Sequence, residues 1–384
     1  MTGVVIAGID MLPFGRYSDR TIADLGAETV LLALDDAGIS IRDVQAFYCG
    51  NLMLASGMVG QRILREIGLT GIPVVNTANA CATGATAFRE GVVAVQSGLY
   101  DVVLAVGVEQ MGKGLLSGNT RTDGFIEEGT VGSGTMPAMF AQIGMEHTRS
   151  YGTTFEQFAK VAVKNHHHAT FNPKAMYRRE TPLEEVMGAE MIAYPITKLM
   201  CSINVDGAAA AVIASESAAR RLGLIKRAVR VRASQLTSNP WSPRESALPD
   251  FNCVTQICAD AAYQAASVDP GDLHLVELHD CFATAEIVHY ENLRLCGPGD
   301  GGRLIDSGAT ALGGRIPVNA SGGLLSKGHP LGATGIANLY EVATHLRGEA
   351  GARQVTGARL GLTHVVGGGP DMGTACAIHI LEKI

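Results

Sequence analysis

Short runs of β-branched and other apolar residues alternate along the chain with longer segments in which apolar residues recur at helical spacing. In the first part of the chain this pattern predicts strands at residues 4–9 and 102–108 and helices at residues 22–37 and 82–96. The second part repeats it, with predicted strands at residues 229–233, 273–278 and 363–366 and predicted helices at residues 254–266 and 335–346. The alternation favours an α/β architecture, and the faint repeat indicates two similar lobes.

The pattern changes between these two parts. Residues 112–198 are richer in Gly, Thr, His, Met and Arg and lack a regular succession of strands and helices, so we expect an inserted, mainly helical region. The small and β-branched residues at 202–213 predict a closely packed buried strand that completes the first lobe. The expected organisation is a first lobe of residues 1–111 and 199–225, an insert of residues 112–198, and a second lobe of residues 226–384.

The composition fits a large buried core and excludes several classes of partner. The 384 residues are 47% hydrophobic and 17% charged. The net charge of -7 comes from 37 acidic and 30 basic residues without a basic stripe, so nucleic acid is not an expected partner. No apolar run approaches the roughly 20 residues that cross a bilayer, and the first residues do not form a secretory signal. The eight cysteines include no C-x-x-C pair, which favours a reduced, cytoplasmic protein.

Cys81 stands where a predicted strand gives way to a predicted helix. A thiol at the start of a helix lies near free N–H groups and the positive end of the helix dipole, which favour the thiolate and lower the thiol pKa. Its position therefore makes Cys81 a candidate nucleophile. The alternative is a buried structural cysteine, which is the commoner role of a single cysteine.

A second junction carries three reactive residues, because His279, Asp280 and Cys281 follow directly on a predicted strand. Sites in α/β folds form at strand ends. The segment is therefore a candidate for acid–base catalysis, with a structural role as the alternative. His279 and Cys281 do not by themselves predict a zinc site, because no second pair of ligands accompanies them.

The third candidate is His329, which glycines surround in residues 319–335 and can present as a general base, although a hydrogen-bonded structural histidine is the alternative. Lys327 stands at the wrong spacing for a phosphate-binding loop. A glycine triplet at residues 367–369 either lets a peptide N–H approach a ligand closely or forms an ordinary turn. Three histidines at residues 166–168 do not predict a metal site, because neighbours on a helix point about 100° apart; we expect a solvated or substrate-facing helix.

Taken together, these segments resemble the thiolase superfamily over essentially the whole chain, and within it the sterol-carrier-protein or lipid-transfer type. The sequence N-A-C-A-T-G at residues 79–84 is similar to the nucleophile segment of that family, H-D-C-F at residues 279–282 to its diagnostic motif, and G-H-P at residues 328–330 to its histidine motif. G-V-E-Q-M at residues 107–111 and N-V-D-G-A-A at residues 204–209 resemble segments that flank the family's inserted loop region. The motifs also occur in the family's order.

The resemblance implies an α/β thiolase fold, with two similar βαβ-type lobes in a layered αβαβα body and an inserted loop region. It also implies a catalytic set with Cys81 as nucleophile and His329 as its base. His279 and Cys281 complete this set, as an oxyanion donor and a general acid. The backbone N–H groups of Cys81 and Gly367 are the implied second oxyanion site.

One departure from ordinary thiolases is informative. Their second catalytic cysteine corresponds to Val365, which cannot move protons, and in the H-D-C-F branch Cys281 takes that duty. The resemblance implies an acyl-CoA C-acyltransferase that cleaves or forms 3-oxoacyl-CoA, with acyl-CoA and CoA as substrates and with no cofactor or metal. It further implies a homodimer or homotetramer. No carrier domain follows the thiolase body, so lipid carriage is not expected.

Two other functions remain open from the sequence. A ketosynthase-like condensing enzyme also combines a cysteine with two histidines on this fold, but it does not need an acid–base cysteine in an H-D-C-F segment. The other is a scaffold subunit, or a lyase that works beside a small zinc-ribbon and OB-fold partner. Only the acyltransferases are expected to load an acyl group covalently onto Cys81.

Overall fold

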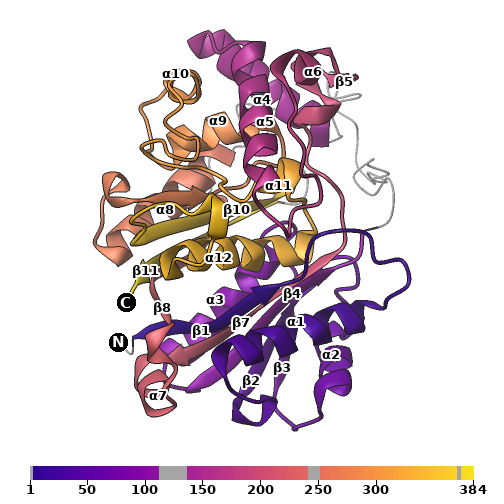
Figure 1. The fold of residues 1–384 in the computed structure, drawn as a ribbon, viewed down its shortest axis with the longest axis vertical. Helices are drawn as coiled ribbons and strands as arrows, with labels where there is room; N and C mark the ends of the chain where they lie inside the picture. The colour runs from indigo at the N-terminus through magenta and orange to yellow at the C-terminus, as the bar shows by residue number, and fades with distance from the viewer. Residues whose placement is uncertain (1–2, 112–135, 241–250, 370–372) are drawn as a thin grey trace.

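The computed structural model describes residues 3–111, 136–240, 251–369 and 373–384 (Figure 1). The first half of the chain forms five strands and their covering helices. In chain order these are β1 (Val4–Met11), α1 (Ile22–Ala37), β2 (Ala46–Gly50), α2 (Val59–Ile67), β3 (Val74–Thr77), α3 (Thr83–Gln96), β4 (Val102–Glu109) and, after the insert, β7 (Gly207–Ser215) and α7 (Glu216–Arg221).

The described part of the insert is mainly helical, as the sequence predicted, and the second half repeats the arrangement of the first. The insert contains α4 (Met136–Tyr151), α5 (Phe155–Thr170), α6 (Leu183–Gly188), β5 (Met191–Ala193) and β6 (Ile196–Thr197). The second half contains β8 (Val229–Ser238), α8 (Phe251–Ala266), β9 (Leu275–Glu277), α9 (Ala283–Asn292), α10 (Gly301–Asp306), α11 (Gly323–Ser326), α12 (Leu331–Arg347), β10 (Leu360–Gly369) and β11 (Gly373–Lys383). Short 3-10 turns lie at Ile41–Asp43, Lys198–Met200, Leu224–Lys226, Pro270–Asp272 and Gly351–Arg353.

The sheet itself carries the internal repeat. Its nine strands have the order β3-β2-β4-β7-β1-β8-β11-β10-β9, and the halves join where β1 pairs antiparallel with β8. Beyond β9, a parallel bridge between Val276 and Val318 occupies the place that β3 has in the first half. Each half therefore has the same succession of parallel and antiparallel neighbours, which confirms two similar lobes. The exact domain boundaries stay a prediction.

Local sequence signals define the ends of α1 where the pattern predicted them. Thr21 accepts a hydrogen bond from the backbone N–H of Asp24, and the Asp24 carboxylate accepts one from the backbone N–H of Thr21, which makes a capping box. Gly38 ends the helix in the left-handed conformation, with φ of 73°. The apolar face of α1 then packs on the outer face of the first half of the sheet.

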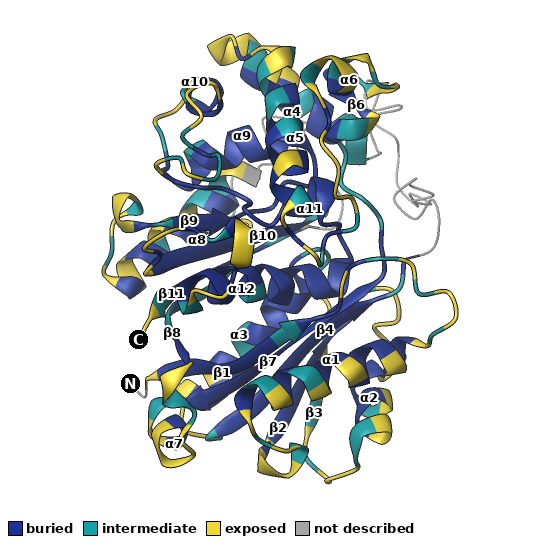
Figure 2. Ribbon diagram, in the orientation of Figure 1, coloured by how far each residue is buried: buried dark blue, intermediate teal, exposed yellow. Residues whose placement is uncertain are grey.

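The helices form three layers around the two halves of the sheet (Figure 1). α1 and α2 cover the outer face of the first half, α8 covers that of the second, and α3 and α12 lie between the halves. Figure 2 shows α12 buried over nearly its whole length. Gly84 at the start of α3 lies directly against Gly332 at the start of α12. A Cβ added to Gly84 would lie 2.4 Å from the carbonyl oxygen of Gly332. The two middle helices therefore meet at their first turns.

The strand predicted at residues 202–213 begins later than expected, at Gly207. The preceding residues bond to the second half of the protein instead: Ser202 donates its N–H to the carbonyl of Cys281, at 2.9 Å, and the carbonyl of Ile203 accepts the N–H of His329, at 2.8 Å. This segment thus ties two of the candidate site residues together. Within the described ranges, no helix is both long enough and apolar enough to span a membrane.

Candidate active site

Cys81 lies in a tight turn between β3 and α3. The carbonyl of Asn79 accepts the N–H of Ala82 at 2.9 Å, and the hydroxyl of Thr83 donates to the carbonyl of Ala80 at 2.6 Å. Ala80 adopts a φ of 47°, a conformation that is costly for a residue with a Cβ and is found where surrounding contacts enforce it. The turn places Cys81 just before the first turn of α3, with its side chain half-buried.

The structure brings Cys81 together with both predicted histidines. His279 follows β9, and His329 precedes α12. The sulfur of Cys81 and one ring nitrogen from each histidine all lie within 4.8 Å of one another. The two imidazoles meet edge to face, with ring centroids 5.1 Å apart. Residues from three distant parts of the sequence therefore form one cluster between the two halves of the sheet.

Cys281 is buried beside this cluster. Burial raises the pKa of its thiol well above the usual range, and the neighbouring Cys81 and Asp280 raise it further. Its carbonyl accepts the N–H of Ser202, which fixes the backbone of the segment. A protonated thiol at this place has the form that a general acid needs.

Burial keeps the reacting groups neutral. It raises the pKa of Cys81 to about 12, against the smaller lowering effect of the backbone N–H at the helix start, and Glu109 raises it further. It lowers the pKa of His329 to about 3 and that of His279 well below its usual value. The lowered Cys81 pKa predicted from the helix start is therefore wrong, because loss of water outweighs the helix dipole.

Two of the buried ring nitrogens, Nδ1 of His279 and Nε2 of His329, have no hydrogen-bond partner among the residues that the structure describes. Buried polar atoms are normally paired, so each unpaired one needs an explanation. Cysteine and histidine are also zinc ligands, so the same three side chains can hold a metal ion. The predicted absence of a metal stays a prediction.

Gly367 lies on β10 directly against the nucleophile turn. A Cβ at this position would stand 2.5 Å from the backbone nitrogen of Cys81 and 2.8 Å from that of Ala82. Only glycine permits this close approach, and the predicted oxyanion site of Cys81 and Gly367 needs the two backbones to lie this close. Val365, two residues earlier on the same strand, is buried.

Two buried carboxylates hold the site in place: Asp280, which the sequence already placed beside His279 and Cys281, and Glu109, which sequence reasoning missed. Asp280 accepts the N–H of Leu324 at 2.8 Å and the side-chain amide of Asn165 at 2.8 Å, which ties the H-D-C-F segment to α11 and to the insert. Glu109 accepts the N–H of Leu52 at 3.0 Å and that of Gly332 at 3.1 Å, which joins the two halves below Cys81. Both acids lie in motifs that the sequence analysis quoted, but their partners are far away in sequence.

The prediction of a solvated or substrate-facing group is wrong for two of the three neighbouring histidines of α5. His166 and His168 are buried, and only His167 is exposed. His166 bonds to the hydroxyl of Ser326 at 2.8 Å, and Nδ1 of His168 donates to the carbonyl of Asn319 at 3.0 Å. The first and third histidines anchor the insert to the segment that precedes His329.

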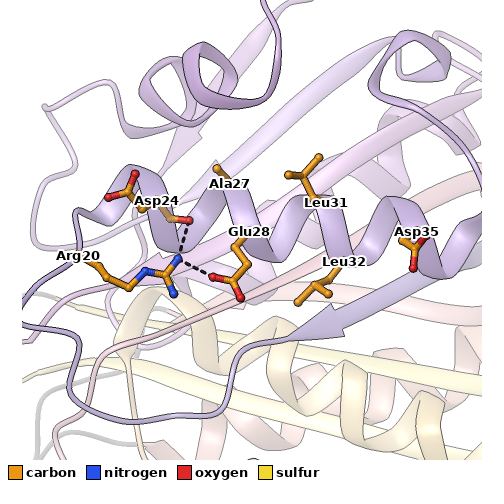
Figure 3. Close-up of a pocket in the computed structure, with 7 residues that line it drawn as sticks. All are labelled: Arg20, Asp24, Ala27, Glu28, Leu31, Leu32 and Asp35. Atoms are coloured by element: carbon orange, nitrogen blue, oxygen red, sulfur yellow. Dashed lines mark hydrogen bonds and ion pairs between the residues drawn. The ribbon is translucent and has the colours of Figure 1, made fainter.

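A shallow groove on the outer face of α1 lies apart from this cluster (Figure 3). Arg20 there donates to the carbonyl of Asp24 at 3.2 Å and pairs with Glu28, and Leu31 is half exposed. The lining residues include no cysteine or histidine. The groove therefore does not overlap the cluster of Cys81, His279 and His329.

The fold and the site together define a cysteine–histidine enzyme, and comparisons with known proteins give its family. The family model described as "Thiolase, N-terminal domain" matches residues 4–190, and that described as "Thiolase C-terminal domain-like" matches residues 241–383. The chain is 39% identical to sterol carrier protein 2 of Bos taurus, over 95% of this chain and 70% of that protein. It is 39% identical to an acetyl-CoA acetyltransferase of Methanothermobacter thermautotrophicus, over the full length of both.

The chain therefore belongs to the thiolase family, with relatives of the sterol-carrier-protein type, and is a thiolase-family acyltransferase that acts on acyl-CoA. A further relative, the benzoylsuccinyl-CoA thiolase subunit BbsB of Thauera aromatica, is 35% identical over 95% of each chain. Among solved structures, an Ltp2-ChsH2(DUF35) aldolase matches with a TM-score of 0.82 at 23% identity over 99% of this chain and 98% of that one. Human mitochondrial 3-ketoacyl-CoA thiolase matches with a TM-score of 0.73 at 18% identity, over 100% of this chain and 99% of the human chain. These structures confirm the thiolase fold.

Proposed function

We propose that the protein is an acyl-CoA C-acyltransferase that cleaves or forms 3-oxoacyl-CoA through an acyl group on Cys81. The observation that carries this proposal is the cluster of one thiol and two buried, neutral imidazoles, with one nitrogen of each ring left without a partner among the described residues. A thiol with an adjacent base is the arrangement that makes a covalent acyl intermediate.

In the degradative direction, His329 takes the proton of Cys81 as the sulfur attacks the 3-keto carbon. Because Cys81 starts as a thiol and His329 as a neutral base, the ion pair forms during the attack rather than before it. The carbon–carbon bond then breaks, Cys81 keeps the shortened acyl group, and the other fragment leaves as an acetyl-CoA enolate. Cys281 gives its proton to this enolate, while His279 and His329 donate hydrogen bonds to its oxygen.

In the second half-reaction, CoA gives its thiol proton to the Cys281 thiolate left by the first step and attacks the acyl group on Cys81. The shortened acyl-CoA leaves, and the Cys81 thiolate takes its proton back from His329. We assign the oxyanion of this step to the backbone N–H groups of Cys81 and Gly367, because the α-carbon of Gly367 lies directly against the backbone nitrogen of Cys81. Synthesis follows the same path in reverse. No metal takes part in any step of this mechanism.

A lyase that acts beside a zinc-ribbon and OB-fold partner is the second candidate. The observation that favours it is the structural match to the Ltp2-ChsH2(DUF35) aldolase, whose name includes a second protein. A lyase of this kind does not need to form an acyl-enzyme. We further propose a cytoplasmic homodimer or homotetramer for the acyltransferase.

Intact-protein mass spectrometry after incubation with acetyl-CoA separates the two functions. The acyltransferase is expected to gain one acetyl group, which is lost in Cys81→Ala and kept in the control Cys296→Ala, whose thiol lies outside the cluster. Wild-type protein that stays unmodified at saturating acetyl-CoA would count against the proposal.

The role of Cys281 has its own test. Cys281→Ala should still accept the acetyl group on Cys81, because that transfer needs no enolate, but it should lose condensation and the exchange of acetyl-CoA methyl protons with deuterated solvent. A second change, Val365→Cys, restores part of the exchange if both positions face the same carbon. Near wild-type exchange in Cys281→Ala would make this cysteine structural and His279 the next candidate.

A further inference from the structure

The ring of His329 is held by one hydroxyl group in the first turns of α12. Nδ1 of His329 lies 2.8 Å from Oγ1 of Thr334, and the same Oγ1 lies 3.0 Å from the carbonyl oxygen of Pro330. Both the histidine and the threonine are buried. These two contacts share a single hydroxyl hydrogen, which decides where the proton of the imidazole sits.

Only one arrangement of hydrogens makes both contacts of the Thr334 hydroxyl hydrogen bonds. If the hydroxyl donates to Pro330, it accepts the Nδ1–H of His329, so both short contacts are hydrogen bonds and Nε2 keeps a lone pair. If the hydroxyl donates to Nδ1 instead, the two oxygens face each other at 3.0 Å without a hydrogen, and the N–H at Nε2 is buried without an acceptor. An orphaned buried N–H is rarer in proteins than an underused acceptor. The first arrangement is therefore the stable one.

We propose that Thr334 is a positioning residue that fixes His329 in the Nδ1–H tautomer and so presents the Nε2 lone pair to Cys81. The inference rests on the proposed function, in which His329 is the base for this thiol. Nε2 is buried, and no residue in the described ranges hydrogen-bonds to it. The nitrogen that the hydroxyl does not hold is thus the one available for the proton of Cys81.

Burial supports the same assignment, because it lowers the pKa of His329 to about 3 and leaves the ring with a single N–H at neutral pH. A neutral imidazole can act as a base only at the nitrogen that lacks the proton. The wrong tautomer would bring an N–H, and not a lone pair, toward Cys81. The tautomer is therefore as important to the reaction as the distance between the two side chains.

Three variants test the proposal. Thr334→Val keeps the shape of the side chain and removes the hydroxyl, and Thr334→Ser restores the hydroxyl. Thr344→Val is the matched control, because Thr344 lies on the same helix and its hydroxyl donates to the carbonyl of Tyr340 without contacting a histidine. Each variant is measured for the rate of acetyl transfer from acetyl-CoA to Cys81 and for the KM of acetyl-CoA.

Thr334→Val is expected to lower the rate of acetyl transfer by about 10- to 100-fold, the range that corresponds to one unsatisfied buried donor. KM should stay unchanged, because the hydroxyl does not bind the substrate. Thr334→Ser and Thr344→Val should both react at close to the wild-type rate. Wild-type rates in a folded Thr334→Val protein would overturn the proposal.

The tautomer can also be read without any activity. In protein labelled with 15N-histidine, the His329 signals are assigned by their loss in His329→Gln, and long-range proton–nitrogen correlations report which ring nitrogen carries the hydrogen. We expect Nδ1–H in the wild type and a shift toward Nε2–H in Thr334→Val. Nε2–H in the wild type would refute the inference. If the wild type shows Nδ1–H but never acetylates Cys81, the proposed function fails and the assignment of the tautomer stands.

Discussion

Gly367 offers a direct test of how closely the nucleophile turn is held, through the change Gly367→Ala. The added Cβ would lie 2.5 Å from the backbone nitrogen of Cys81, whereas ordinary contacts begin at 3.4 Å, so the atoms must separate by about 0.9 Å. The atoms in the way belong to the backbone and cannot rotate aside. The φ of Gly367 is not among the positive values, so the strain comes from this contact alone.

The expected magnitude follows from this displacement. A misplacement of about 1 Å at a reacting group can cost on the order of 100-fold in rate. We therefore expect Gly367→Ala to acetylate Cys81 about 100-fold more slowly than the wild type, although alanine keeps the backbone N–H. Insertion of one methyl group into a packed site also destabilises the fold by about 1–3 kcal/mol.

Gly361→Ala is the matched control, on the same strand and the same face of the sheet. Its Cβ would also meet an atom at 2.5 Å, but this is Cγ1 of Val342, and the next is Cδ2 of Leu275 at 2.9 Å, so only side chains lie in the way. Urea unfolding should show a loss of stability in both variants, smaller in Gly361→Ala because side chains can move aside, whereas mass spectrometry should show slow acetylation only in Gly367→Ala. Equal acetylation rates in the two variants would refute the idea that Gly367 fixes the nucleophile.

Three further predictions concern protonation and the buried carboxylates. Because burial raises the pKa of Cys81 to about 12, the rate of its alkylation by iodoacetamide should increase steadily from pH 7 to pH 10. A plateau below pH 8 would show that the helix start lowers the thiol pKa more than burial raises it. Asp280→Asn should slow solvent exchange of the acetyl-CoA methyl protons more than acetylation of Cys81, since it loosens the Cys281 segment; an equal slowing of both would point to general disorder of the site. Burial alone would raise the pKa of Glu341, but the neighbouring Arg353 and Lys327 lower it to about 2, below its unfolded value. This carboxylate therefore contributes stability at neutral pH that is lost as the pH falls from about 5 to 2. Arg353→Met should accordingly cost about 3–5 kcal/mol in urea unfolding, against less than about 1 kcal/mol for Arg294→Met in an exposed pair.

Much of the fold and the central cluster could be predicted from the sequence, because both follow from short-range signals. Strands and helices can be predicted from the periodicity of their apolar residues, and the ends of α1 also from its capping residues. Cys81, His279 and His329 each stand in a recognisable segment at the end of a strand or the start of a helix.

What the sequence could not supply depends on contacts between distant residues. His168 is buried at a position where its ring donates a hydrogen bond to the carbonyl of Asn319, a residue 151 positions away in the sequence. The raised pKa of Cys81 depends on how much of both halves surrounds the sulfur, whereas the helix start is a local feature. The pattern of residues along the chain predicts neither the burial of His168 nor the pKa of Cys81.

The repeat in the sheet has a consequence for how the catalytic pair is built. Cys81 lies before α3, which follows the third strand of the first half, and His329 lies before α12, which follows the corresponding bridge in the second half. The nucleophile and the base thus come from equivalent segments of the two halves, each just before a middle helix. The two segments face each other where α3 and α12 meet. The separation of sulfur and imidazole is therefore set by the docking of one half on the other, and any substitution that tilts the halves, however remote, acts directly on the proton transfer.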